Sequence, residues 1–261
     1  MEYYKKLIKD DGDTEKVCDN FRKGLDNIHR DDILTLICIQ GEVDMMEVFF
    51  NEFYPVGCSL KFLLDADISY NIETIKILVN FDPNIFSICN ENEQERINRF
   101  FQKICRTGDV ALVKFFLGLD ITLNKEDTTA INYCCCTIWK QENYYQIAKL
   151  LIEHNFSTKN ENLLINACET GSANLVSLLI ENDADVNTQN GMPLVKAGIA
   201  GHIDIVKILL SNGANTNGFD YILHRLSKSE HKKYYDTIDL LVDEGVDVKV
   251  LAKIYAYLLF R

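Results

Sequence analysis

Short polar breaks separate amphipathic stretches along the chain. Aliphatic residues stand three and four positions apart in "NLVSLLIEND" (residues 174–183) and again in "IDIVKILLSN" (residues 203–212). This spacing places them on one face of an α-helix, so each stretch predicts a short helix with one buried side. The pattern therefore indicates an all-α protein built from many similar helices.

The amphipathic stretches belong to a repeating unit. Residues 166–187 align with residues 196–217, with Gly171 on Gly201, at an offset of 30 residues. The same combination, a polar or glycine break before a helix with paired aliphatic residues, recurs upstream and downstream. The breaks fall at Gly41, Asn71, Gly108, Asn143, Gly171, Gly201 and Lys233. The sequence therefore predicts about seven units.

The units resemble ankyrin repeats. "AGHIDIVKILLSNGAN" (residues 200–215) nearly matches the family pattern, and "MPLV" (residues 192–195) stands where the family usually has Thr-Pro-Leu-His. The resemblance implies that each unit is a β-turn followed by two antiparallel helices. Because one helix pair cannot bury its apolar side alone, we expect the units to stack into an all-α ankyrin-repeat solenoid of about seven helix-turn-helix units with capping segments.

The array is expected to span residues 33–248. Residues 1–32 show no clear unit and are rich in charge, so we expect a divergent repeat or a polar N-terminal cap there. Residues 249–261 are apolar and are expected to cover the last repeat as a C-terminal capping helix.

The turn between the two helices of a unit favours glycine, which adopts a positive φ at little cost. Asn71 and Asn143 take its place in two units, and asparagine is the residue next best suited to that conformation. Two turns contain extra residues, "TIWKQE" (residues 137–142) in the fourth unit and "LSKSEHKK" (residues 226–233) in the seventh. Insertions in solenoids often lie on a functional face.

Cys134, Cys135 and Cys136 stand side by side. The first two align with Ala197 and Gly198, where the resemblance implies small residues that pack on neighbouring helices. A free cysteine behaves as a small buried hydrophobic residue, so we expect packing for this pair and solvent access for Cys136. The alternative is a metal or redox site. It is disfavoured because adjacent helical residues point about 100° apart and cannot converge on one zinc ion.

The formal net charge of -12 opposes binding to nucleic acid or to anionic lipid. The same charge favours a basic protein partner through long-range attraction. No window approaches the ~20 apolar residues of a membrane span, and the first residues are polar where a signal peptide would be apolar. Nine scattered cysteines do not resemble a secreted disulfide framework. We therefore expect a cytoplasmic monomer, in the host cytoplasm if the protein is viral.

No catalytic motif is present: the chain has no Gly-rich phosphate loop and no His-Glu-x-x-His. "DADVN" (residues 183–187) resembles an acidic pair, but it falls where an ankyrin unit leaves its second helix, so we expect a solvated loop. We expect no enzyme activity, no metal and no cofactor. An enzyme with its site in the divergent units before residue 100 is the alternative.

Ankyrin proteins resemble one another in binding other proteins on a concave surface of loop tips and first helices, so the resemblance implies a protein-interaction scaffold. Phe219 and Trp139 are the favoured anchors, because exposed aromatic residues dominate binding hot spots. Burial of Trp139 in the core is equally open. The residues expected to contact the partner are Arg106, Asp127, Trp139, Glu169, Asn190, Lys196, Phe219 and Asp220.

Asn187, with Leu179 eight positions before it, matches the pattern by which ankyrin domains resemble substrates of asparaginyl hydroxylases. The alternative is that its side chain only hydrogen-bonds the backbone of its own loop.

The degenerate repeats and the composition resemble mimivirus-like ankyrin proteins of giant DNA viruses of amoebae, which implies a host-interaction factor. An intracellular bacterial effector or an amoebal protein is the alternative. Some viral ankyrin proteins carry a C-terminal segment that recruits a ubiquitin ligase. Residues 250–261 are too short for that motif, so a substrate-recruiting adaptor is a minor alternative.

Overall fold

The residues that the computed structural model describes are Asp19, Ile37, 44–48, 72–82, Phe86 and 91–215. The chain divides into two compact parts, an N-terminal part at residues 1–124 and a C-terminal part at residues 125–261. Within the described residues every regular element is a helix, which confirms the all-α class. No helix in this part of the chain is both long and apolar enough to cross a bilayer.

Several predictions fall outside the described residues. They concern the caps at residues 1–32, apart from Asp19, and 249–261, the seventh unit, the breaks at Gly41, Asn71 and Lys233, and the expected binding residues Phe219 and Asp220. These stay predictions.

In the N-terminal part, α6 (Ile72–Phe81) precedes a pair formed by α7 (Glu91–Arg106) and α8 (Val110–Leu117). A short turn with Gly108 at φ 71° joins the pair. Asp109 caps α8, since its side chain accepts a hydrogen bond from the third residue of that helix at 3.0 Å.

Aromatic side chains fill the space between α7 and α8. Phe116 on α8 is wholly buried, and its ring centroid lies 5.5 Å from that of Phe101 and 5.9 Å from that of Phe100. Phe86 meets the same ring edge to face at 5.6 Å. Such aromatic pairs stabilise a core beyond the area that they bury.

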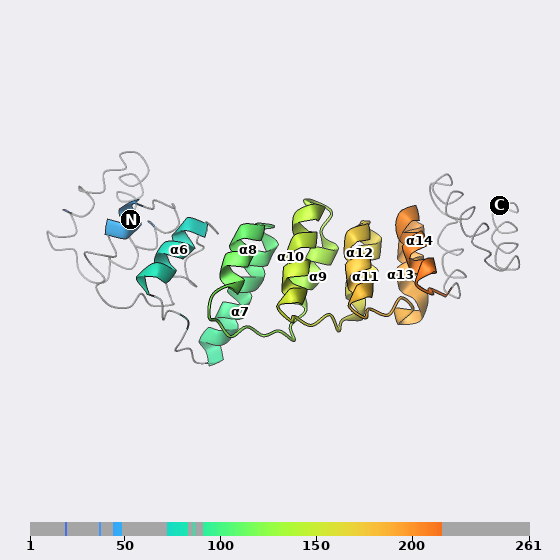
Figure 1. Ribbon diagram of the computed structural model, residues 1–261, viewed down its shortest axis with the longest axis horizontal. Helices are drawn as coiled ribbons and strands as arrows, with labels where there is room; N and C mark the ends of the chain where they lie inside the picture. The colour runs from blue at the N-terminus through green and yellow to red at the C-terminus, as the bar shows by residue number, and fades with distance from the viewer. Residues whose placement is uncertain are drawn as a thin grey trace, which may run out of the picture. The chain divides into compact units, whose positions relative to one another are not determined.

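The described residues of the C-terminal part form three helix pairs that stand side by side in chain order (Figure 1). The first helices of the pairs are α9 (Thr129–Cys136), α11 (Glu161–Thr170) and α13 (Thr188–Ala200). The second helices are α10 (Gln141–Glu153), α12 (Ala173–Glu181) and α14 (Ile203–Ser211). Each first helix packs on its own second helix, and α11 also packs on both α9 and α13. This stacking confirms the solenoid.

The first helices contact one another more extensively than the second helices do. Small residues explain this close approach, because they let neighbouring helix backbones come together without a cavity. The buried small residues of α9, α11 and α13 include Cys134, Cys135, Ala167, Cys168, Ala197 and Gly198. The predicted packing of Cys134 and Cys135 is thereby confirmed.

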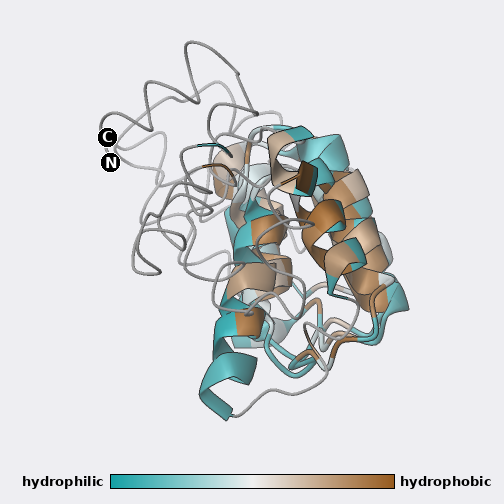
Figure 2. Ribbon diagram, turned by 90° about the vertical axis from the view of Figure 1, so that its left-hand side faces the viewer, coloured by the Kyte–Doolittle hydropathy of each residue, from teal (hydrophilic) through white to brown (hydrophobic). Residues whose placement is uncertain are grey.

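The second helices bury the aliphatic residues that the pattern placed on one face. Leu175, Val176 and Leu179 of α12 are buried, and so are Ile205 and Val206 of α14. Figure 2 shows hydrophobic segments in brown beside hydrophilic segments in teal on the helices of the described part of the chain. An amphipathic helix of this kind is stabilised mainly by its neighbours rather than by its own propensity.

The turns within the pairs follow the prediction at three positions and depart from it at a fourth. Besides Gly108, Gly171 and Gly201 adopt positive φ values, of 84° and 74°. Asn143, however, lies inside α10, so its expected positive φ is wrong; Lys140 has φ 52° instead. Gln141 and Glu142 extend the helix, where an acidic residue in the first turn is favourable. The inserted turn is therefore residues 137–140 rather than 137–142.

Candidate interaction surface

The exposed and half-buried positions of the first helices make one polar surface, which we call the first-helix face. Its residues are Asn132, Cys136, Asn162, Asn166, Glu169 and Lys196. They lie three or four positions apart within a helix, so they share a side, while the small residues beside them face the neighbouring helices.

Side chains of the first-helix face are joined from one repeat to the next. The Asn166 amide donates a hydrogen bond to the Asn132 Oδ1 at 2.9 Å, which links α11 to α9. Lys196 of α13 contacts both carboxylate oxygens of Glu169 at 2.8 Å. The half-exposed ion pair adds little stability by itself. Its effect is to hold both side chains in one orientation, which lowers the entropy that a partner must remove on binding.

The inserted turn of the fourth unit exposes two large apolar side chains. Trp139 is 81% exposed and Ile138 is 67% exposed, so Trp139 is not a core residue. The turn begins at Thr137, whose hydroxyl donates to the Tyr133 carbonyl at 2.8 Å. It is followed by Gln141, the first residue of α10, whose amide donates to the Thr170 carbonyl of the next repeat at 3.2 Å. The indole is thus held out into solvent on a turn that is anchored at both ends.

Three further expected binding residues lie within the described ranges and do not belong to the first-helix face as defined. Arg106 is exposed at the end of α7, in the part of the chain at residues 1–124. Asp127 is half-buried and accepts a hydrogen bond from the Thr129 N–H at 2.8 Å, at the start of α9. Asn190 is exposed near the start of α13, where residues 189–191 have positive φ and interrupt the helix; its own φ is 61°. Among the expected binding residues, Glu169 and Lys196 contact each other directly.

Asn187 joins its loop to the loop of the following repeat. Its Oδ1 accepts a hydrogen bond from the Asn215 N–H at 2.7 Å, and its amide donates to the Gly213 carbonyl at 3.1 Å. The alternative that its side chain bonds only its own loop is therefore wrong. Within that loop the Asp185 carboxylate accepts from the Asn187 N–H at 2.8 Å, as expected for a solvated turn.

The cysteine triplet divides as its position in α9 predicts. Cys134 and Cys135 are wholly buried, and Cys136 is exposed. Burial raises the pKa of the Cys105 and Cys168 thiols to about 12, so neither is a nucleophile near neutral pH. No cluster of three or more metal-ligating side chains occurs within the described ranges.

Cys136 is expected to be alkylated by iodoacetamide in the native protein while the buried thiols of α9 stay protected. Partial burial, and secondarily the charge of Glu169, raises the pKa of Cys136. Less thiolate is then present at a given pH, so labelling is slower than for an ordinary thiol and accelerates as the pH rises. Glu169→Gln should speed it at fixed pH. Peptide mass spectrometry reports the sites, and equal labelling of Cys134 would contradict the assignment.

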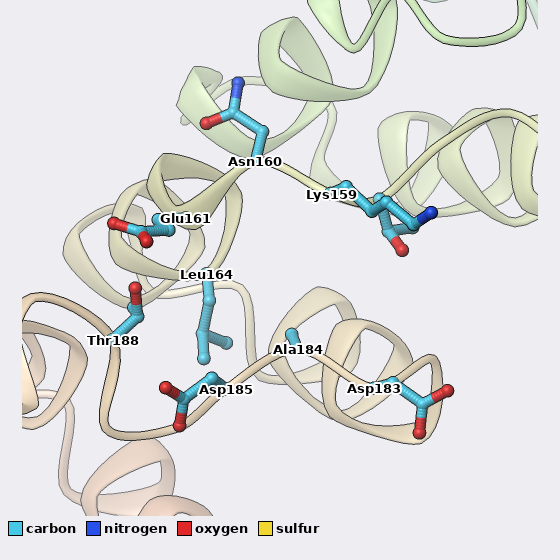
Figure 3. A pocket seen from close by; sticks show the side chains of 9 residues that line it. Lys159, Asn160, Glu161, Leu164, Asp183, Ala184, Asp185 and Thr188 are labelled. Carbon is cyan, nitrogen blue, oxygen red and sulfur yellow. The ribbon is translucent and has the colours of Figure 1, made fainter.

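A pocket of about 270 Å³ that the sequence did not predict lies between the start of α11 and the loop that follows α12 (Figure 3). Its lining includes Lys159, Glu161, Leu164, Asp183, Asp185 and Thr188. The two walls come from different repeats. No local sequence pattern predicts such a pocket, because only the stacking of the repeats brings its walls together.

Comparison with known families supports the repeat assignment directly. The family model for ankyrin repeats (3 copies) matches residues 140–220 and residues 164–252. This part of the chain therefore consists of ankyrin repeats, and the fold is an ankyrin-repeat solenoid. Ankyrin repeats generally mediate protein–protein interaction, and proteins built from them are typically non-catalytic scaffolds. No curated protein matches the chain.

Proposed function

We propose that this protein is a non-catalytic scaffold that binds a partner protein across the first-helix face and the adjoining turn at residues 137–140. The observation that carries the proposal is Trp139, a large aromatic side chain that is 81% exposed. An aromatic residue of this size gains much by leaving water, and exposed aromatic residues that become buried are the commonest binding hot spots. The polar side chains of the first-helix face, ordered in advance, would then form the polar part of the interface.

The partner is proposed to be basic. The net charge of -12 attracts a basic protein and speeds its association, an effect that salt screens. Arg106, Asp127, Asn190, Phe219 and Asp220 stay predictions for further contacts with the partner.

A cytoplasmic location, a monomeric state and modification of Asn187 also remain proposals. So do a giant-virus origin and a host-interaction role. The ubiquitin-ligase adaptor depends on residues 250–261, and an enzyme site depends on the divergent units before residue 100. No observation favours either of these over a binding scaffold.

Affinity capture from the native cells, followed by measurements with the purified partner, tests the proposal. Trp139→Ala is expected to raise the Kd about tenfold or more, because the partner pocket that receives the indole is left unfilled. Lys149→Ala, at an exposed position of the second helix α10, is the matched control and should leave the Kd within about twofold of the wild type.

The same partner should associate more slowly as ionic strength rises. If the Trp139→Ala variant binds the partner as tightly as the Lys149→Ala variant does, the turn at residues 137–140 is not part of the interface. An association rate indifferent to salt would refute the basic partner.

A further inference from the structure

We propose that the pocket at the start of α11 receives the side chain of a lysine or an arginine of the partner protein. This inference rests on the proposed function and adds to it the chemistry of one contact. Two independent features carry it: a buried hydroxyl without a hydrogen-bond partner, and the charges around that hydroxyl.

Thr188 provides the hydroxyl. It lines the pocket and is only 5% exposed, and no group in the described part of the chain hydrogen-bonds to its Oγ1. Figure 3 shows this oxygen on the side of Thr188 that faces Glu161. A buried hydroxyl without a partner is unfavourable, because it has left water without replacing the lost bonds. Its lone pairs can accept a hydrogen bond from an N–H group in the pocket.

The charges of the lining select a cation. The lining carries three carboxylates, those of Glu161, Asp183 and Asp185, and one ammonium group, that of Lys159. Figure 3 places Glu161 and Asp185 at the same end of the pocket as Thr188, with Lys159 at the opposite end. Neither Glu161 nor Lys159 forms an ion pair with another described residue. A positive group beside Thr188 is therefore attracted by two carboxylates and lies far from the lysine.

The N-terminus of α11 would favour an anion instead, but its groups are already engaged. The Asn160 side chain accepts a hydrogen bond from the Asn162 N–H at 3.0 Å, and the Asn160 carbonyl accepts from the Leu163 N–H at 3.0 Å. Glu161 adds a carboxylate in the first turn. An anion would thus meet negative charge and few unused donors.

A metal ion fits the pocket poorly. The carboxylates of Asp183 and Asp185 point in different directions in Figure 3. Neither belongs to any cluster of potential metal ligands in the described residues. A cation with directional N–H donors on a long stem fits better, because it can reach one end of the pocket.

Size and polarity agree with a single long side chain. The volume of about 270 Å³ lies just below the usual range for drug-sized ligands, about 300–1,000 Å³. Leu164 and Ala184 provide apolar contacts for the methylene groups of the incoming side chain. Lysine and arginine characteristically pack their stems on apolar surface while the charged end stays among polar groups.

Titration of the full ¹⁵N-labelled chain with N-acetyl-arginine methylamide and with N-acetyl-lysine methylamide tests the proposal by NMR. At least one of them should shift the amides of residues 160–164 and 183–188 saturably at millimolar concentration. N-acetyl-citrulline methylamide has nearly the same shape as the arginine probe without its charge, and should leave these amides unchanged. Comparison of the arginine and lysine titrations shows which head group the pocket prefers.

Two variants separate a binding role from a structural one. Thr188→Val keeps the shape of the side chain and removes the acceptor, so the affinity for the cationic probe should fall about tenfold. The same variant should unfold at a higher denaturant concentration than the wild type, because the unsatisfied hydroxyl is gone. A hydroxyl with a structural role would give the reverse shift. Glu161→Gln should lower the affinity for the cationic probe. Glu153→Gln, which removes an exposed carboxylate at the end of α10, should leave that affinity unchanged.

The proposal is overturned if the citrulline and arginine probes shift the same amides equally, if neither cation shifts them, or if Thr188→Val binds the probe like the wild type. These outcomes are independent of the Trp139 experiment. Loss of probe binding with an intact Trp139 effect would refute only the pocket. Probe binding without any Trp139 effect would refute only the larger interface.

Discussion

Gly171→Ala is expected to lower the free energy of unfolding by about 2–5 kcal/mol. Gly171 has φ 84°, where a residue with a Cβ atom is strained. A Cβ atom there would also lie 2.5 Å from the Cε1 atom of His202, in the next repeat. Moving the imidazole aside would break the contact of its Nε2 with the Glu169 carbonyl, which lies at 3.2 Å. Urea unfolding followed by circular dichroism measures the loss.

Gly213→Ala is the matched control for this substitution. Gly213 has nearly the same φ, 81°, but no atom lies within 4 Å of the added Cβ. It should therefore lose only the backbone share, about 1–2 kcal/mol. In a His202→Ala background the extra cost at Gly171 should largely disappear, since the clash has been removed. Equal losses for the two glycines would show that the contact with His202 does not constrain the stacking.

Phe116→Ala is expected to destabilise the N-terminal part, residues 1–124, by about 3–5 kcal/mol, because the ring is wholly buried and its removal leaves a cavity. The three neighbouring phenylalanine rings cannot close this space without leaving their own contacts. Hydrogen exchange should show faster opening of α7 and α8. The amides of α11 to α14 should change less, since repeats interact mainly with their immediate neighbours.

Phe115→Ala provides the comparison for this second substitution. Phe115 is the adjacent residue and the same side chain, but it is only half-buried. Its loss should cost clearly less, and protection of α7 should stay close to that of the wild type. If the two variants destabilise the chain equally, the cluster around Phe116 is not the core of this helix pair.

Local patterns predicted the helix pairs correctly because the spacing that forms them is itself local. The aliphatic residues at 175, 176 and 179 are buried as their period requires, and Gly171 and Gly201 have the positive φ expected of their turns. The burial of Cys134 and Cys135 followed from one further fact, that their positions match those of small residues in another repeat. Comparison of repeats within one chain thus gives some information about tertiary packing.

The errors arose where a turn or a side chain depends on the neighbouring repeat. Asn143 was assigned to the turn by residue type, but the helix begins two residues earlier and Lys140 takes the left-handed conformation. One alternative for Asn187 was a bond to its own loop, yet its side chain bonds residues 213 and 215 of the next loop; its modification stays a prediction. In both cases residue preference was a weaker influence than the geometry of the stack.

The sequence by itself determined that the repeats are pairs of amphipathic helices, because the hydrophobic period acts over a few residues and recurs from repeat to repeat, with glycine in several of the turns. Only the tertiary structure decided that Trp139 stays in solvent, that Lys196 meets Glu169, and that the Thr188 hydroxyl is buried without a partner. These features depend on atoms from other repeats or on the space between them. Contacts of that kind leave no period along the chain, so stacking alone creates the surface and the pocket on which the proposed binding depends.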